Sequence, residues 1–253
     1  MAKPAALNQG RDISFIAGGT EPALPSAGLA QSYIERPLLL DGYKSDLRLY
    51  LLVREEALTS GRRRLRSYLY RQGLVRLSSM EYAPPVCSLA ADDPAMASLL
   101  TNFSLHKNAA DFALPDERGE TGSKRSLSAL WAELQLRGVD TAAVWEEICE
   151  IARESCASVY RQWRANAVAA RIRLRKPANF FQLVGLDVLL SERDVSEHQG
   201  GGRRLRAHYL EVNHNPSLSL TSALDTAVKT GIVRDSVALV TAGGPLGHFQ
   251  ALD

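Results

Sequence analysis

The sequence has no run of 18 consecutive apolar residues, the length that a membrane-spanning helix needs. Its first eight residues lack the charged, apolar and small-residue segments of a secretory signal peptide. The three cysteines, Cys87, Cys149 and Cys156, are widely spaced and form no CxxC motif, so neither a zinc knuckle nor a disulfide framework is indicated. These absences predict a cytoplasmic protein with reduced thiols and no contact with a membrane.

A strong net charge is also missing, because 30 basic residues almost balance 28 acidic ones. With 45% hydrophobic residues, the chain of 253 residues can bury a sizeable core. The charge is uneven, however: residues 61–76 hold six arginines and no acid, and residues 161–206 hold ten basic residues against four acidic ones. Such patches favour an anionic partner, either nucleic acid or an acidic protein tail, although a solvated face without a partner explains the charge equally well.

The apolar patterns predict strands mixed with a few long helices. Strands are expected at residues 12–17, 45–54, 65–71, 74–78, 180–190 and 205–212. Helices are expected at residues 123–137, from Asp140 onward, and at 220–240. The two strands on either side of Gln72-Gly73 are predicted to form a hairpin. In the second helix, apolar positions from Val144 to Val159 follow the spacing of one helical face, and Cys149 and Cys156 are expected in its core.

Two acids interrupt strands that are otherwise apolar. Asp187 lies within FFQLVGLDVLL and Glu211 within YLEVN, where Asn213 shares the face of Glu211 because side chains alternate along a strand. A buried carboxylate is costly unless a cation or a metal pairs with it. Two acids and an amide oxygen are hard ligands that suit Mg²⁺. For either acid alone, backbone N–H groups or an arginine are the alternative partners.

Other charges also gather on single strand faces. The segment KSDLR places Lys44, Asp46 and Arg48 on one side of a strand and leucines on the other, and Arg76 lies on a face of a later strand. Each such face belongs either to a site or to a solvated strand edge. Near the start, residues 8–11 (NQGR) are similar to a phosphate-contacting loop, but a single glycine also fits a plain turn.

Seven segments stand in the order that is found in the tubulin-tyrosine-ligase-like family, which the chain resembles from residue 3 to about residue 217. They are KPAALNQGRDI, YIERPLLLDGYKSDLRLYLLV, YRQGLVRLSSMEYAPP, LLTNFSLHK, TGSKRSLSALW, FFQLVGLDVLL and YLEVNHNPSL. The resemblance implies an α+β, ATP-grasp-like fold with mixed or antiparallel sheets and flanking helices. Residues 1–253 would form the central and C-terminal parts of one catalytic domain, with an ordered core at about 3–241. TGSKRSLSALW and EVNHNPS are closer to the polyglutamylase branch of the family.

The resemblance also implies roles for single residues. Those implied in catalysis are Lys44, Arg48 and Arg76. Those implied to bind ATP are Lys3, Gln9, Gln31, Tyr33, Ile34, Lys44 and Asp46. Those implied to hold Mg²⁺ are Asp187, Glu211 and Asn213, which the strand pattern also selects.

As an activity, the resemblance implies ATP-dependent ligation of an amino acid, in the first place glutamate, to a protein tail. ATP phosphorylates a carboxylate of the acceptor, and the amine of the amino acid then attacks the acylphosphate. The expected partners are free glutamate and the acidic tubulin tails of microtubules, which the arginine-rich segments would attract. The expected location is the cytoplasm and its cytoskeleton, including cilia, with no nucleic acid or membrane as a partner.

Two features leave other functions open. The chain begins in the middle of the family's core, so its N-terminal part is expected to be missing. Asp12 stands where the family usually has a second glycine, and a carboxylate near phosphates would repel them. A catalytically inactive module that binds tubulin or microtubules is therefore the first alternative. A ligase of the same family that adds glycine or tyrosine, or that modifies another protein, is the second.

Overall fold

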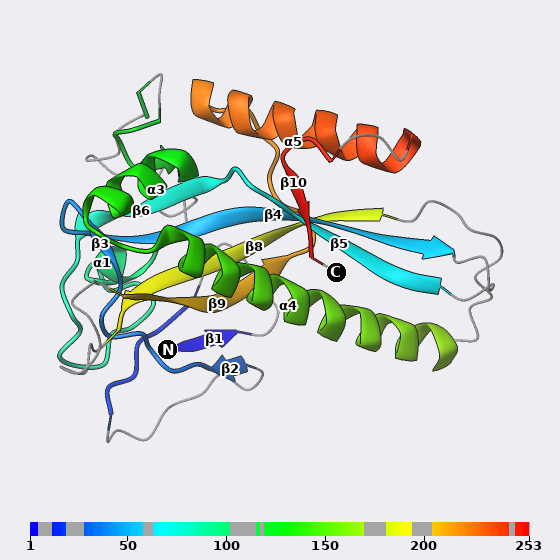
Figure 1. The fold of residues 1–253 in the computed structure, drawn as a ribbon. Helices are drawn as coiled ribbons and strands as arrows, with labels where there is room; N and C mark the ends of the chain where they lie inside the picture. Colours follow the sequence, from blue (N-terminus) through cyan, green and yellow to red (C-terminus); the bar gives the residue numbers. More distant parts are fainter. Residues whose placement is uncertain are drawn as a thin grey trace, which may run out of the picture.

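The computed structural model describes residues 1–4, 12–18, 28–57, 63–101, 115–116, 119–169, 181–193, 204–242 and 246–252. Within these residues, an eight-stranded antiparallel sheet forms the centre of the molecule (Figure 1). Its strands are β3 (Leu39–Leu40), β4 (Tyr43–Ala57), β5 (Arg63–Tyr70), β6 (Leu74–Glu81), β7 (Lys124–Ser126), β8 (Phe181–Glu192), β9 (Leu205–Asn213) and β10 (Phe249–Ala251). A smaller sheet pairs β1 (Ala2–Pro4) with β2 (Gly28–Ala30). The helices are α1 (Met96–Leu99), α3 (Leu127–Leu136), α4 (Thr141–Ala169) and α5 (Ala223–Ala242).

The large sheet is organised around β4, the longest strand. One edge of β4 pairs with β8, and the opposite edge pairs first with β6 and then with β5. β5 and β6 thus follow each other along the same edge of β4, and the hairpin predicted at Gln72-Gly73 is wrong. The chain does not reverse at Gly73, because β5 and β6 run in the same direction along β4. Glycine is needed at this position because a Cβ would lie 2.9 Å from the carbonyl oxygen of Arg48.

The side chains of β4 alternate between two cores. Leu49 and Leu51 pack in the core that α3 and α4 cover, whereas Tyr50 and Leu52 pack in the core that α5 covers. Figure 1 shows α4 and α5 on opposite faces of the sheet. The charged residues at the start of β4 share the face of Tyr50, so the sequence places them on the α5 side.

The helix predicted after Asp140 is α4, and its start is confirmed. The Asp140 carboxylate accepts hydrogen bonds from the N–H groups of Ala142 and Ala143, which is the geometry of an N-cap. Both Cys149 and Cys156 are buried against the sheet, as expected from the helical spacing. Val159, predicted on the same face, is 59% exposed instead.

Several elements differ from those that the sequence predicts. Residues 124–126 form β7, which pairs with β6, and the helix begins only after Ser126, whose hydroxyl caps it. Residues 12–17 form isolated bridges instead of a strand. β10 was not predicted. None of the described helices is long and apolar enough to cross a membrane.

Candidate active site

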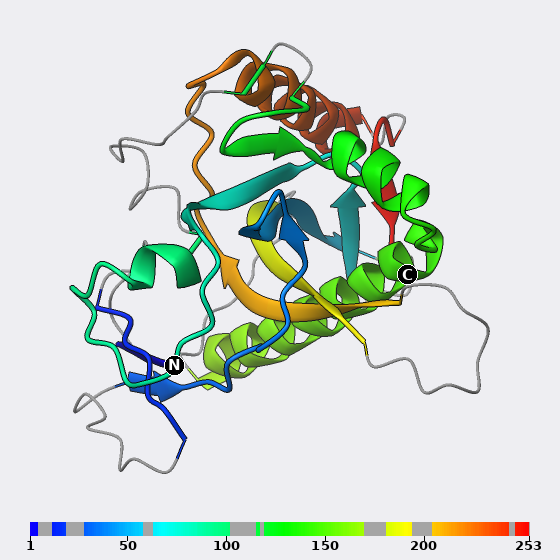
Figure 2. The same cartoon turned by 90° about the vertical axis from the view of Figure 1, so that its left-hand side faces the viewer.

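Five strands bring charged side chains into two neighbouring rows on the face that α5 partly covers. Register pairs Arg48 with Asp187 and Asp187 with Glu211 in the first row, across β4, β8 and β9. The second row runs across β4, β6 and β7 and consists of Asp46, Arg76 and Lys124. Directly paired residues on neighbouring strands point to the same face. Register therefore explains how residues far apart in the chain meet at this end of the sheet, which faces the viewer in Figure 2.

Asp187 is the centre of the first row and is 2% exposed. Arg48 donates to it from Nε at 2.5 Å and from Nη2 at 2.9 Å, and Arg76 donates from Nη2 at 2.9 Å. Burial alone would raise the pKa of Asp187, but the two guanidinium groups hold that pKa below its usual value. The buried acid is thus ionised at neutral pH, and arginines are its partners in this structure.

Arg76 joins the two rows. Its Nε and Nη2 donate to the carboxylate of Asp46 at 2.7 and 2.6 Å, in addition to the bond to Asp187. Burial alone would lower the pKa of Arg76, but the two carboxylates raise it. The hydroxyl of Thr101 donates to Asp46 at 2.5 Å. Sequence reasoning missed Thr101, although it stands in the LLTN segment, whose Asn102 lies outside the described residues.

Lys44 shares a strand face with Asp46, but its ammonium group points toward α1 and the segment after β2. Nζ donates to the carbonyl oxygen of Leu99 at 2.8 Å and lies 4.6 Å from the centre of the Tyr33 ring. Burial lowers the pKa of Lys44 to about 8; the charge of Asp46 opposes this shift, and that of Lys3 adds to it. The structure therefore places Lys44 and Tyr33, both predicted to bind ATP, in contact. Lys3, also predicted to bind ATP, is near enough for its charge to act on Lys44.

For the other residues predicted to bind ATP, the structure gives fewer contacts. Gln31 continues the pairing of the small sheet, because its N–H donates to the carbonyl oxygen of Met1 at 2.8 Å. Ile34 is half-buried in the same segment, and Gln9 lies outside the described residues. Asp12 has a φ of 55°, a left-handed conformation that glycine adopts without strain. That geometry accounts for a preference for glycine at this position.

Asn213 connects Asp187 with Glu211. Its Nδ2 lies 3.3 Å from Oδ2 of Asp187 and 3.1 Å from Oε1 of Glu211, so the three side chains converge. The described residues contain no group of three His, Cys, Asp or Glu side chains that could hold a metal ion. Mg²⁺ does not require one, since it is commonly bound by one or two carboxylates together with substrate phosphates. The two carboxylates fit that ion, and Asn213 would add its amide oxygen only with its side-chain amide turned over, because here its nitrogen faces both acids.

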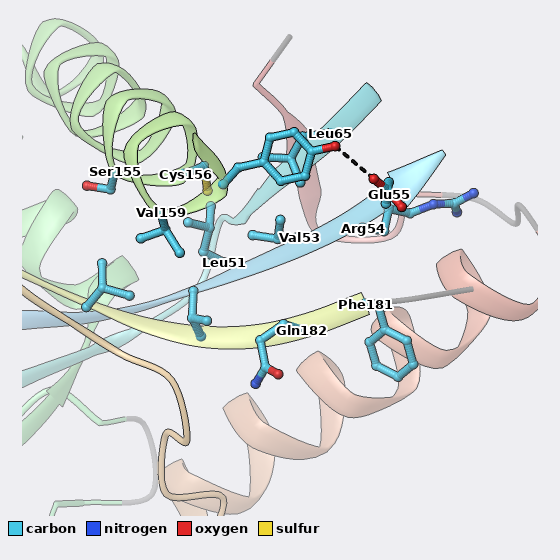
Figure 3. A pocket seen from close by; sticks show the side chains of 13 residues that line it. Leu51, Val53, Arg54, Glu55, Leu65, Ser155, Cys156, Val159, Phe181 and Gln182 are labelled. Carbon is cyan, nitrogen blue, oxygen red and sulfur yellow. Dashed lines mark hydrogen bonds between the residues drawn. The ribbon is translucent and has the colours of Figure 1, made fainter. Parts of the chain in front are cut away.

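An apolar pocket of about 320 Å³ lies elsewhere, between α4 and the far parts of β4, β5 and β8 (Figure 3). Leu51 and Val53 form part of its lining, and the hydrogen bond from Tyr160 to Glu55, 2.8 Å long, crosses one side. These β4 side chains point away from the face that carries Arg48. The sheet therefore separates this pocket from the two charged rows.

Comparison with known proteins gives a consistent result. The pattern of the tubulin-tyrosine ligase family matches residues 1–245. Human tubulin polyglutamylase TTLL6 is 31% identical over 241 residues, which cover 95% of this chain and 24% of the human protein. Human tubulin monoglutamylase TTLL4 is 32% identical over 240 residues, which cover 94% and 18%. A probable beta-tubulin polyglutamylase of Tetrahymena thermophila is 30% identical over 248 residues, which cover 95% and 19%. The chain thus spans about a fifth to a quarter of the length of these relatives.

Proposed function

The chain belongs to the tubulin-tyrosine ligase family, and we propose that it forms the nucleotide-binding and catalytic part of an ATP-dependent ligase that adds glutamate to a protein. The observation that carries this proposal is that two arginines donate to Asp187 and that Asn213 connects Asp187 with Glu211. Fixed cations beside a set of oxygen ligands suit a reaction in which phosphate is transferred to a carboxylate.

In the proposed reaction, an oxygen of the acceptor carboxylate attacks the γ-phosphorus of ATP, and ADP leaves. The amine of glutamate then attacks the acyl carbon of the acylphosphate; phosphate leaves with the bonding electrons, and the nitrogen loses a proton. Bound Mg²⁺ would neutralise charge on the phosphates. Buried carboxylates hold Arg48 and Arg76 in place and offset part of their charge, so the two guanidinium groups would act on the phosphates without reorganisation. Lys3 and Lys44 would supply positive charge at the nucleotide end.

The proposed acceptor is the acidic tail of tubulin, which would place the protein on cytoplasmic microtubules. The names of the relatives support tubulin and glutamate. The far end of the sheet also supports an acidic partner, because Arg54, Arg64 and Arg66 all lie 3.2 Å from the carboxylate of Glu56. Three cations against one anion leave this cluster positively charged. Its attraction for an acidic tail should weaken as salt is added.

The proposed activity can be tested with the full-length protein, microtubules, ATP and Mg²⁺. Labelled glutamate, glycine and tyrosine are supplied in separate reactions. We expect label from glutamate to enter the tubulin tails. Incorporation of glycine or tyrosine alone would identify another ligase of the family. Microtubule binding without incorporation of any of the three would identify an inactive binding module.

The depressed pKa of Lys44 predicts a pH dependence of nucleotide binding. Because the folded protein has a pKa of about 8 at Lys44 against an ordinary 10.5, the unfolded chain binds more protons between these values. The stability of the fold should therefore rise with pH in this window.

Nucleotide affinity should fall as pH rises, since the ammonium group of Lys44 loses its charge above about pH 8. The affinity is measured by titration from about pH 7 to about pH 9.

The matched variant for this measurement is Lys44→Arg, because a guanidinium group stays charged throughout the range. We expect the fall in affinity to disappear in Lys44→Arg. An identical pH profile in both proteins would show that Lys44 does not act on the nucleotide.

A further inference from the structure

The chain between β9 and α5 crosses the face of the sheet that carries the site, and we refer to residues 214–222 as the crossing segment. Figure 2 shows it in orange, running from the end of β9 to the start of α5. At its beginning, the carbonyl oxygen of His214 accepts a hydrogen bond from Nε2 of Gln182 at 2.7 Å. His214 directly follows Asn213, which bonds Asp187, so the segment starts next to the first charged row.

Pro216 of the crossing segment packs against Gly185 of β8. A Cβ at position 185 would lie 3.1 Å from Cβ of Pro216 and 3.4 Å from Nε of Arg48. The proline ring and the arginine thus lie over the same glycine. A shift of the crossing segment would change the space in which Arg48 reaches Asp187.

Asp225, in the first turn of α5, binds the last two residues of the crossing segment, Thr221 and Ser222. It is 0% exposed. The hydroxyls of Thr221 and Ser222 donate to its Oδ2 at 2.6 and 3.1 Å, and Nζ of Lys124 donates to the same oxygen at 2.7 Å. Lys229 reaches the other oxygen at 2.6 Å. One carboxylate therefore holds α5, the crossing segment and β7 together.

One further bond ties this cluster to the segment, and one strand pairing ties it to the site. Nζ of Lys229 donates to the carbonyl oxygen of Ser219 at 2.7 Å. Lys124 is the register partner of Arg76, the residue that joins the two charged rows. Burial alone would raise the pKa of Asp225, but its hydrogen bonds, those from Lys124 and Lys229 foremost, hold that pKa at about 2. Asp225 is therefore charged at neutral pH and offsets two buried lysines.

We propose that Asp225 is a positioning residue of the active site: it anchors the crossing segment to β7, and the segment in turn holds Arg48 on Asp187. Asp225 bonds Lys124 of the second row but, within the described residues, forms no hydrogen bond with Arg48 or Asp187, so its effect on the reaction is transmitted. The inference rests on the proposed ligase activity. Neither local sequence pattern nor the resemblance singles out this residue, because its partners come from three separate segments.

The test compares glutamate transfer by the full-length protein with transfer by Asp225→Asn, which keeps the shape of the side chain and removes its charge. We expect kcat to fall by about tenfold to a hundredfold, as for a misplacement of catalytic groups. The KM for ATP should change by less than about twofold, because the proposed nucleotide contacts, Lys3 and Lys44, are not altered. A role in stability alone would change neither parameter per folded molecule.

Three variants complete the test. Thr221→Val removes the shortest bond between the crossing segment and Asp225 and leaves both lysine pairs intact, so it should lower kcat even if Asp225→Asn fails to fold. Asp140→Asn, at the N-cap of α4, is the matched aspartate control, and Glu192→Gln, at the exposed end of β8, replaces an acid outside the two rows. Both should keep the wild-type kcat. Wild-type kcat in Thr221→Val and in folded Asp225→Asn would overturn this inference alone. An inactive wild type would overturn the proposed function with it.

Discussion

Glu211→Gln is expected to slow glutamate transfer by about a hundredfold or more while the protein stays folded. Glu211 is half-buried and accepts a hydrogen bond from Asn213 at 3.1 Å. Glutamine has the same shape and keeps an oxygen acceptor for that bond. It lacks the charge that a divalent cation requires, so the fold should survive and the reaction should not. The measurement is the initial rate at saturating substrates, together with the midpoint of thermal unfolding.

Glu192→Gln is the matched control, because Glu192 is an exposed acid at the end of the neighbouring strand. It should keep the wild-type rate. If Glu211→Gln also transferred glutamate at that rate, Glu211 would have no part in holding the cation, and the proposed metal set would lose its second acid.

Arg76→Ala is expected to lower the free energy of unfolding by about 3–5 kcal/mol and to stop the reaction. Arg76 is 8% exposed and bonds Asp46 and Asp187, which are themselves 3% and 2% exposed. Removing the guanidinium group leaves one of two buried carboxylates without its ion pair. Among the described residues, Asp187 keeps Arg48 and Asn213, whereas Asp46 keeps the hydroxyl of Thr101. Urea unfolding measures the loss.

Arg64→Ala serves as the comparison for that loss. Arg64 is an arginine on β5 whose side chain is 46% exposed, and its removal should cost less than about 1 kcal/mol. The double variant Arg76→Met with Asp46→Asn should recover part of the stability, because it removes both charges of one pair, but none of the activity. Equal stabilities of Arg76→Ala and Arg64→Ala would show that the buried network does not hold the sheet together.

The sequence located the site by a simple rule, since a charge inside an apolar strand must find a partner. Period-two alternation put Asp187 on a buried strand and Glu211 with Asn213 on one face of another, and the structure brings the three side chains together. The rule worked because strands β8 and β9 are long and apolar enough to be recognised. The roles in metal binding and catalysis remain predictions.

Other parts of the site depend on which strands pair and in what register, and the local sequence pattern of a single strand does not predict this. Thr101, Lys124 and Asp225 reach the charged rows from three segments that show no alternation of their own. The placement of β5 and β6 on one edge of β4 was missed for a related reason. A Gln-Gly pair indicates a turn, but the pairing of β5 and β6 with successive parts of β4 shows that the chain continues in the same direction.

The most direct test of the account is nucleotide binding with and without Mg²⁺. A non-hydrolysable ATP analogue is titrated into the full-length protein and into Glu211→Gln, in Mg²⁺ or in a chelator. We expect Mg²⁺ to tighten binding to the wild type by about tenfold or more, which corresponds to about 1.4 kcal/mol. Glu211→Gln should lose this gain and keep the affinity measured in the chelator. A wild type that binds equally well in both conditions, or a variant that keeps the full gain, would contradict a site in which Asp187, Glu211 and Asn213 hold a cation against the nucleotide.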